Sequence, residues 1–319
     1  SCLYIIDIMK NFREIKPHLY ALLFFIGISF AYFSPILEGK VLNMQDIKNW
    51  KGMSKEVQDF RETTGDEALW TNSMFSGMPA YQISTKYKGN LIQYVHKALS
   101  LGIPRPANIL FLYLLGFYIL LLSLKIDYRL SAVGAIAFAF SSYLFIIIQA
   151  GHMTKAYALA YMPMVVASVL YTYRGKLLLG GVLTSLAVSL EIYANHLQIT
   201  YYLFLILVLI GFVQFIKEFK RDNLTDFFSR TTILLLAALL ACGTSLTRLA
   251  TTMEYSKEST RGKSELTNDM DNKTTGLDKD YATQWSYGIS ESLTLLIPNF
   301  HGGASQGELT TNSETYKAL

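Results

Sequence analysis

The sequence predicts an all-α polytopic membrane protein with about seven transmembrane helices and a long first extracytoplasmic loop. Its composition is the first indication: 51% of the 319 residues are apolar, 13% are aromatic and only 16% are charged, where soluble proteins have about 25% charged residues. The second is that apolar residues gather in long runs such as Ile109–Leu122, which shows no polar stripe at helical spacing. A mean hydropathy of +0.29 agrees. Together these observations exclude a disordered chain, a coiled coil and a disulfide scaffold, and they disfavour an ordinary cytosolic enzyme.

Seven apolar runs reach the length of roughly 17–25 residues that a helix needs to cross a bilayer. They are Leu19–Ile36, Pro106–Leu124, Leu130–Ala150, Ala156–Tyr173, Leu177–Tyr193, Leu197–Ile216 and Thr231–Leu249. The first run also has the features of a cleaved signal peptide, because Lys10, Arg13 and Lys16 precede it and its residues Ser29 and Ala31 are small. Its length and the six runs after it favour a membrane anchor. Met9-Lys10-Asn11 resembles a natural start of translation.

The distribution of Lys and Arg predicts which way the helices are oriented. If the runs alternate across the membrane, residues 1–16, 125–129, 174–176 and 217–230 share one side, and their 38 residues contain 11 Lys or Arg. Loop 37–105 has nine in 69 residues, together with seven acidic residues. Positive residues favour the cytoplasmic side. We therefore expect a cytoplasmic N-terminus in the bacterial inner membrane, with loop 37–105 outside.

The predicted organisation is a cytoplasmic N-terminus (1–16), a transmembrane domain (17–250) and an extracytoplasmic segment (251–319). Within the long loop, Leu91, Ile92, Val95, Ala98 and Leu99 have helical spacing, with Gln93, His96 and Lys97 opposite, which is typical of a helix lying in the membrane interface. Residues 251–290 are polar, as in a lid or a disordered segment. Because no closing element precedes Leu319, we expect the chain to be part of a longer protein.

Polar residues in or beside membrane helices are costly, so they are the default candidates for a functional site. Under the predicted topology the candidates all lie on the outer side: Asp46, Asp66, Glu67, His152, Lys155, Glu191, His196, Arg248 and Arg261. Each also has an ordinary interpretation. Asp46 or Arg261 could be a solvated charge, Lys155 could extend to the interface, and either histidine could be a packed, hydrogen-bonded residue. Glu191 ends an apolar run and needs a partner, for which Lys155 and Arg248 are candidates.

An acid, one or two cations and an aromatic-lined interface suit a lipid-phosphate-linked donor. Lys155 and Arg261 would hold the phosphate and stabilise the leaving charge. Asp46 would deprotonate an acceptor hydroxyl or hold a divalent cation that does so. A net charge of +4 in short clusters does not favour nucleic acid, and Cys2 and Cys242 form neither a disulfide framework nor a CxxC site.

Several strings resemble the YfhO family of bacterial membrane proteins, particularly its Bacteroidetes-type members. The strings are Gln45-Asp46-Ile47, Trp70 to Gln82 (WTNSMFSGMPAYQ), Gly151-His152-Met153-Thr154-Lys155 and Gln284-Trp285-Ser286-Tyr287-Gly288. The resemblance covers nearly the whole chain from about Met9. It implies a GT-C-type glycosyltransferase fold that uses a polyprenyl-phosphate sugar on the outer face to modify an envelope polymer. It also implies that Asp46 is the acidic residue of the first loop, with Asp66 and Glu67 as weaker candidates.

Two other functions fit the composition. A transporter or lipid flippase would place binding groups at mid-depth on helices broken by Gly or Pro, together with an inverted repeat. Apart from Pro106, which begins the second run, the prolines in the runs are Pro35 and Pro163, and no charge lies at mid-depth. A structural or assembly partner would tolerate the simultaneous loss of Asp46 and Lys155. The sequence therefore predicts a membrane glycosyltransferase first.

Overall fold

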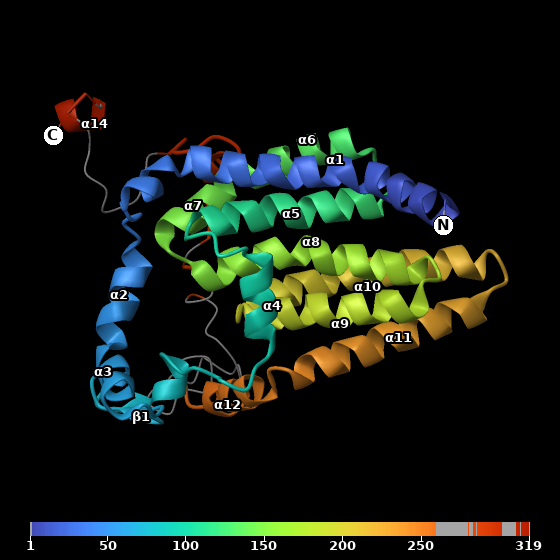
Figure 1. Cartoon of the computed structure of the whole chain (residues 1–319). Coiled ribbons are helices and arrows are strands. Elements are labelled where there is room, and N and C mark those ends of the chain that lie inside the picture. Colours follow the sequence, from blue (N-terminus) through green and yellow to red (C-terminus); the bar gives the residue numbers. More distant parts are fainter. Residues whose placement is uncertain are drawn as a thin grey trace.

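The computed structural model describes residues 2–259, 280, 283–284, 286–301, 311–312 and 314–318, and it is almost entirely α-helical (Figure 1). Apart from short 3₁₀ turns, the helices are α1 (Cys2–Tyr32), α2 (Gln45–Met53), α3 (Lys55–Thr64), α4 (Ile92–Leu99), α5 (Ala107–Ser123), α6 (Tyr128–Ala139), α7 (Ser142–Ala150), α8 (Met153–Tyr173), α9 (Leu177–Tyr193), α10 (Leu197–Phe219), α11 (Leu224–Gly243), α12 (Leu246–Ser256) and α14 (Glu314–Ala318).

Four of the described helices are long and apolar enough to cross a membrane: Glu14–Tyr32 within α1, and α8, α10 and α11. A fifth span results if α6 and α7, which bend by 50° at their junction, are counted as one. α5 and α9 are apolar but shorter, at 17 residues each. The chain is thus an all-α membrane protein, whereas seven complete spans stay a prediction.

Two predicted runs differ from the helices that form. The run Leu130–Ala150 is broken because Ser141 has an extended backbone (φ −65°, ψ 140°). The run Thr231–Leu249 is divided between α11 and α12, so Arg248 lies on a separate short helix. Both breaks occur where small or hydroxylated residues interrupt the apolar pattern.

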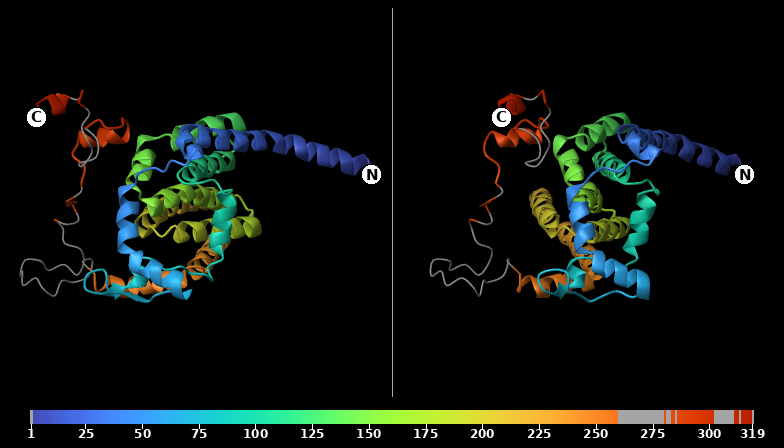
Figure 2. Two further views of the ribbon diagram at one scale, coloured as in Figure 1. Left: turned by 60° about the vertical axis from the view of Figure 1, so that its left-hand side comes forward. Right: turned by 90° about the vertical axis from the view of Figure 1, so that its left-hand side faces the viewer.

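The helices pack around α5, whose first half is buried from Ala107 to Leu114. α1, α6 and α8 surround it, and α9 lies between α8 and α11 (Figures 1 and 2). Small residues allow the close approaches: a Cβ on Gly116 of α5 would lie 2.4 Å from the carbonyl oxygen of Ala160 in α8, and one on Gly180 of α9 would overlap Thr172. Small residues at helix interfaces are typical of membrane bundles.

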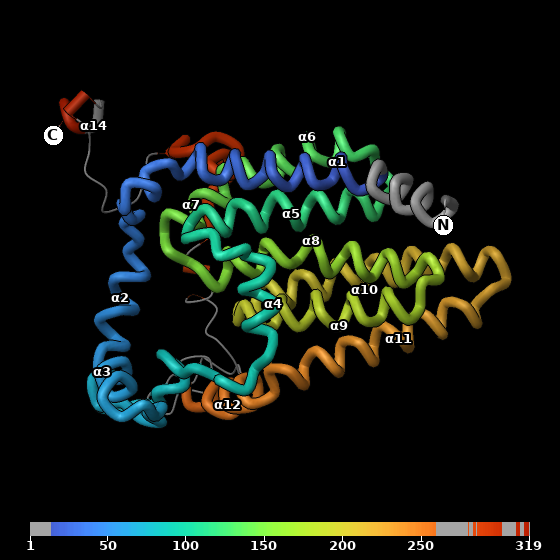
Figure 3. The backbone as a smooth tube through the Cα atoms, viewed as in Figure 1, coloured from blue at the N-terminus to red at the C-terminus, as the bar shows by residue number. Residues whose placement is uncertain are grey.

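The long helices share two common ends. Segment 33–106, the α7–α8 and α9–α10 turns, and α12 gather at one end, here called the loop end (Figures 1 and 3). The basic turns at 124–127, 174–176 and 220–223 lie at the opposite end. The turns therefore fall at the two opposite ends of the bundle, whereas the membrane topology and which end faces the cytoplasm stay predictions.

Segment 33–106 has a structure of its own. After α2 and α3, the strands β1 (Trp70–Thr71) and β2 (Met78–Pro79) pair in antiparallel fashion. Gly77 has a φ of +123°, and a Cβ there would lie 2.9 Å from the indole of Trp70. Glycine is therefore needed both for the turn conformation and for the close contact with the ring.

The helix predicted around residues 91–99 is confirmed as α4, but its faces differ from the prediction. Ile92 is buried and His96 turns inward, whereas Leu91 and Tyr94 are exposed. α4 packs against α9. One edge of its predicted polar face therefore points into the molecule.

Candidate functional site

A cavity of about 1130 Å³ lies at the loop end. α2, α3 and residues 81–87 form one part of its wall, and α4, the starts of α5, α8 and α10, the end of α9, and α12 form the rest. Trp50 and five tyrosines line it: Tyr81, Tyr87, Tyr157, Tyr161 and Tyr193. Such a mixture of aromatic rings and convergent polar groups is typical of a ligand site.

The charge of the wall is strongly positive. Its cations are Arg61, Lys86, Lys97, Arg105 and Arg248, and Glu62 is the single acidic residue among the lining side chains of the described chain. Arg61 is paired with Glu67. Within the described residues the other four cations form no ion pair with a carboxylate. The cavity therefore favours an anionic ligand.

Arg248 is held in place by aromatic rings and a carbonyl group. Its guanidinium lies 4.8 Å from the ring centroid of Tyr87 and 5.8 Å from that of Tyr193. Its Nη1 also donates to the backbone oxygen of Tyr193 at 3.1 Å. Arginine stacked on rings keeps N–H groups for a further acceptor, and its planar fork suits phosphate.

His96 is the second fixed group of the wall. Its Nδ1 lies 2.5 Å from the hydroxyl of Tyr161. Its ring meets that of Tyr157 edge-on, at 4.8 Å between centroids and 88° between planes, and lies 5.7 Å from the Tyr193 ring. Burial, and secondly the charge of Arg105, lower the pKa of His96 below its usual 6.5. The imidazole is therefore neutral at neutral pH.

Several buried polar atoms of the wall have no hydrogen-bond partner among the described atoms. Asn108, at the start of α5, donates its Nδ2 to the Tyr157 hydroxyl at 3.0 Å, but its Oδ1 has no partner among the described atoms. The same holds for three other buried polar atoms of lining residues: Gln82 Nε2, Thr85 Oγ1 and Ser100 Oγ. Buried polar groups are normally paired, so this concentration beside one cavity marks it as a polar binding region.

The predicted acid, Asp46, lies beside this cavity rather than in its wall. One carboxylate oxygen of Asp46 lies 2.7 Å from Nδ1 of His152, and both side chains are about half exposed, at 47% and 48%. Gly151 makes the contact possible: its φ is +90°, and a Cβ there would lie 3.0 Å from Met44 and 3.4 Å from Asp46. Trp50 and Met153, close to the pair in sequence, do line the cavity.

Lys155 and Glu191 do not join Asp46. The ammonium of Lys155 lies 5.3 Å from the ring centroid of Tyr143. Glu191 is fully buried, and Thr200 Oγ1 donates to its Oε1 at 3.3 Å, while its Oε2 has no partner among the described atoms. The expectation that Lys155 or Arg248 pairs with Glu191 is therefore wrong, because Lys155 and Arg248 each stack on tyrosine rings instead.

His196 does line the cavity, and its Nδ1 accepts a hydrogen bond from the backbone N–H of Ile199 at 3.3 Å, which caps α10. Arg261, the predicted second phosphate ligand, lies outside the described residues.

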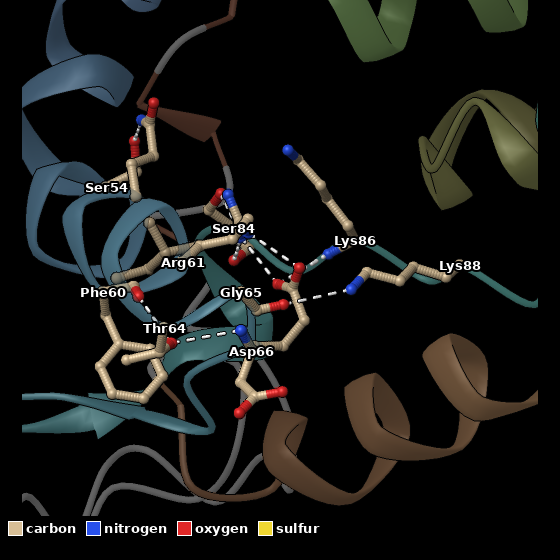
Figure 4. Close-up of polar contacts among 12 residues, drawn as sticks. Ser54, Phe60, Arg61, Thr64, Gly65, Asp66, Ser84, Lys86 and Lys88 are labelled. Carbon is tan, nitrogen blue, oxygen red and sulfur yellow. Dashed lines mark hydrogen bonds and ion pairs between the residues drawn. The ribbon is translucent and has the colours of Figure 1, made fainter.

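Glu67 has a structural position. Arg61 donates to its two carboxylate oxygens at 2.8 Å each, and to the carbonyl oxygen of Ser84 (Figure 4). Burial raises the pKa of Glu67, but the bonds from Arg61 and the backbone N–H of Lys86 outweigh it, and the pKa is lowered. Asp66 is exposed and points away from Arg61 (Figure 4). Neither acid lines the cavity.

Sequence reasoning missed two groups. Glu56 accepts hydrogen bonds from the Thr71 hydroxyl and from the backbone N–H groups of Asn72 and Ser73, which lower its pKa. The cavity group of His96, Lys97 and Arg105 was also missed. The polar face predicted for residues 91–99 contained two of these three residues, and this was the available signal.

Among the described residues, no group of three His, Cys, Asp or Glu side chains is placed to hold a metal ion. No protein-family profile, no curated protein and no solved structure matches this chain.

Proposed function

We propose that the protein is a membrane glycosyltransferase that takes a sugar from a polyprenyl-phosphate donor and attaches it to a cell-envelope acceptor. The observation that carries the proposal is the cavity at the loop end. Four cations that have no carboxylate partner among the described residues and six aromatic side chains converge there beside apolar helices. The cations match a phosphate, aromatic faces match sugar rings, and the helices match a lipid tail.

Each part of the reaction has candidate residues. Lys86, Lys97, Arg105 and Arg248 would hold the phosphate and stabilise the charge that develops when the bond from the sugar C1 to the phosphate oxygen breaks. Asp46, at the edge of the cavity, would accept the proton of the attacking hydroxyl. Its pair with His152 leaves the carboxylate about half exposed, so an acceptor hydroxyl can reach it. Lys155 would contribute positive charge outside the cavity.

Replacing Arg248 with Met tests the cavity. This change keeps most of the side-chain volume but removes the charge and the bond to Tyr193. We expect sugar incorporation into envelope polymer to fall at least tenfold, since charge-assisted contacts to phosphate contribute roughly 1.5–3 kcal/mol. Lys257→Met, on the residue that follows α12, is the control, because Lys257 does not line the cavity. Equal incorporation by both variants would contradict the proposal.

Asp46→Asn tests the proton acceptor separately. We expect a loss of about 100-fold or more in transfer, within the range for removing a general base. Asp59→Asn is the matched control, because Asp59 lies on α3 and, among the described residues, forms its ion pair with Lys55. Undiminished transfer by a stably inserted Asp46→Asn protein would remove Asp46 from the mechanism and leave the cavity's role intact.

A transporter or lipid flippase is the second candidate, and one observation favours it. α6 and α7 form a bent pair with a 50° break, and discontinuous helices recur at transport sites. Purified protein in liposomes separates the two functions. Movement of a fluorescent polyprenyl phosphate across the bilayer without sugar transfer would support transport, whereas transfer to an added acceptor would support the enzyme.

A further inference from the structure

The position of His96 leaves one of its ring nitrogens for a ligand. Asn90 fixes α4: its Oδ1 accepts from the N–H of Ile92 at 3.0 Å, and its Nδ2 donates to Ser245 at 3.1 Å. The Nδ1 of His96 is occupied by the Tyr161 hydroxyl. Because His96 lines the cavity, its Nε2 is the nitrogen that a bound molecule can reach.

The charged and titratable groups around His96 come from every neighbouring element. Arg105 precedes α5 and acts on His96 electrostatically. Tyr157 and Tyr161 come from α8, and Tyr193 from the end of α9. The carboxylate of Glu191, also on α9, interacts electrostatically with the hydroxyl of Tyr161.

Three further groups line the same cavity. They are Lys97 from α4 itself, His196 from the α9–α10 turn, and Arg248, which is stacked on Tyr193. The charged side chains of the cavity wall are thus mostly cations, and the charge of Arg105 disfavours a further positive charge on the imidazole.

We propose that His96 is a proton-linked binding residue for the anionic group of a phosphodiester, taking up a proton from solvent when that group binds between it and Arg105. The inference rests on the proposed ligand class. The anion offsets the charge of Arg105, so the imidazolium becomes favourable. His96 then has N–H donors on both nitrogens, one for the Tyr161 oxygen and one for the phosphoryl oxygen.

Proton uptake has a measurable consequence. Because the complex binds more protons than the free protein, affinity must increase as the pH falls. The increase is about tenfold for each unit by which the His96 pKa differs between the bound and free states. The free-state pKa lies below 6.5, so the slope should appear between about pH 5 and 8.

Binding is measured on the purified full chain in detergent by calorimetry. The probe is a methyl farnesyl phosphodiester, whose single charge stays constant between pH 5 and 8. We expect tighter binding at pH 5.5 than at pH 8, and buffers of different ionisation enthalpy should reveal fractional proton uptake near pH 6.5. This wild-type measurement needs no variant. Binding without uptake would overturn the inference and leave the proposed function standing.

Variants identify the residue that takes up the proton. His96→Gln should flatten the pH dependence, because glutamine donates a hydrogen bond but does not titrate in this range. Lys97→Gln is the matched control on the same helix and cavity, and it should weaken binding at every pH with the slope kept. His196→Gln should also keep the slope. A wild-type slope in His96→Gln, or its loss in Lys97→Gln, would overturn the assignment.

Two further probes identify the source of the anion. Farnesol tests the tail alone and dimethyl phosphate tests the head group alone. If dimethyl phosphate binds as tightly as the farnesyl phosphodiester and with the same pH dependence, the result would support the role of His96 in binding the anion. It would contradict a lipid-linked donor. No binding of any probe would overturn the proposed ligand class and, with it, this inference.

Discussion

The Arg61–Glu67 pair joins two segments that are distant along the loop. Both side chains are largely buried, at 11% and 17% exposure, and Arg61 also reaches the carbonyl oxygen of Ser84. Because Arg61, Ser84 and Lys86 belong to the cavity wall, this buried cluster fixes the wall at residues 84–86. Removing one partner of such a buried pair is strongly destabilising, because the other charge is then left buried without a partner.

Glu67→Gln should therefore lower the free energy of unfolding by about 2 kcal/mol, the typical value for hydrogen bonds to charged groups. The lowered pKa of Glu67 sets the pH dependence. As the pH falls, the carboxylate of Glu67 binds a proton in the unfolded state before it does so in the folded state. The stabilisation of the wild type is therefore complete above about pH 4.5 and decreases below it. Thermal unfolding in detergent at several pH values measures both effects.

Glu62→Gln is the control for this prediction. Glu62 is exposed on α3, next to Arg61 in sequence, and substitution at exposed sites usually changes stability by no more than about 0.5 kcal/mol. If the two variants unfold at the same temperature, the Arg61–Glu67 pair does not support the loop.

Individual site residues were predictable only as members of one face. Alternation of apolar runs placed Asp46, His152 and His196 together at one end, and the fold has them there. It did not predict that Asp46 meets His152, because that contact depends on the left-handed turn at Gly151 and on how α2 packs there. It also did not predict that Glu191 would bond Thr200 instead of a cation, since nothing in one helix specifies its neighbour's side chains.

At the scale of elements, the hydrophobic runs predicted where helices form, because each apolar segment must satisfy its own backbone hydrogen bonds. They did not predict where helices break. Residues 130–150 are almost uniformly apolar, yet the extended backbone at Ser141 divides them into α6 and α7. The amphipathic pattern of residues 91–99 predicted α4 but not which face turns inward, because an aromatic pocket formed by α8 and α9 accepts the His96 ring.

Gly116→Ala tests the contact between α5 and α8. Alanine ordinarily stabilises a helix interior by roughly 0.5–1 kcal/mol relative to glycine. Here the new Cβ would lie 2.4 Å from the Ala160 carbonyl oxygen, a backbone atom that cannot rotate away. We expect a net loss of about 1–3 kcal/mol, the usual cost of overpacking, seen as a lower unfolding temperature.

Gly27→Ala supplies the control. Gly27 lies in α1, and a Cβ there would have no atom within 4 Å. Its unfolding temperature should equal or exceed that of the wild type. Should Gly116→Ala behave like Gly27→Ala, α5 and α8 do not pack as closely as the geometry requires.

At the scale of the whole molecule, basic residues and the cavity lie at opposite ends of the helical bundle. The turns at 174–176 and 220–223 carry exposed Lys and Arg at one end of the bundle, and the cationic, aromatic cavity opens at the other. The positive-inside rule assigns the first end to the cytoplasm. The cavity would then face the side on which lipid-linked sugars are used to modify envelope polymers, so orientation is a test of the proposed function as well as of the topology.

Cysteine labelling measures this orientation directly. In a protein whose two native cysteines are replaced by serine, Lys51→Cys places an exposed thiol on α2 at the loop end, and Lys176→Cys places one in the α8–α9 turn. A membrane-impermeant maleimide added to intact spheroplasts should label position 51 and should reach position 176 only after permeabilisation. Equal labelling of both positions in sealed spheroplasts would mean that these ends do not lie on opposite sides. The reverse pattern would place the cavity in the cytoplasm, where an extracytoplasmic sugar donor could not reach it.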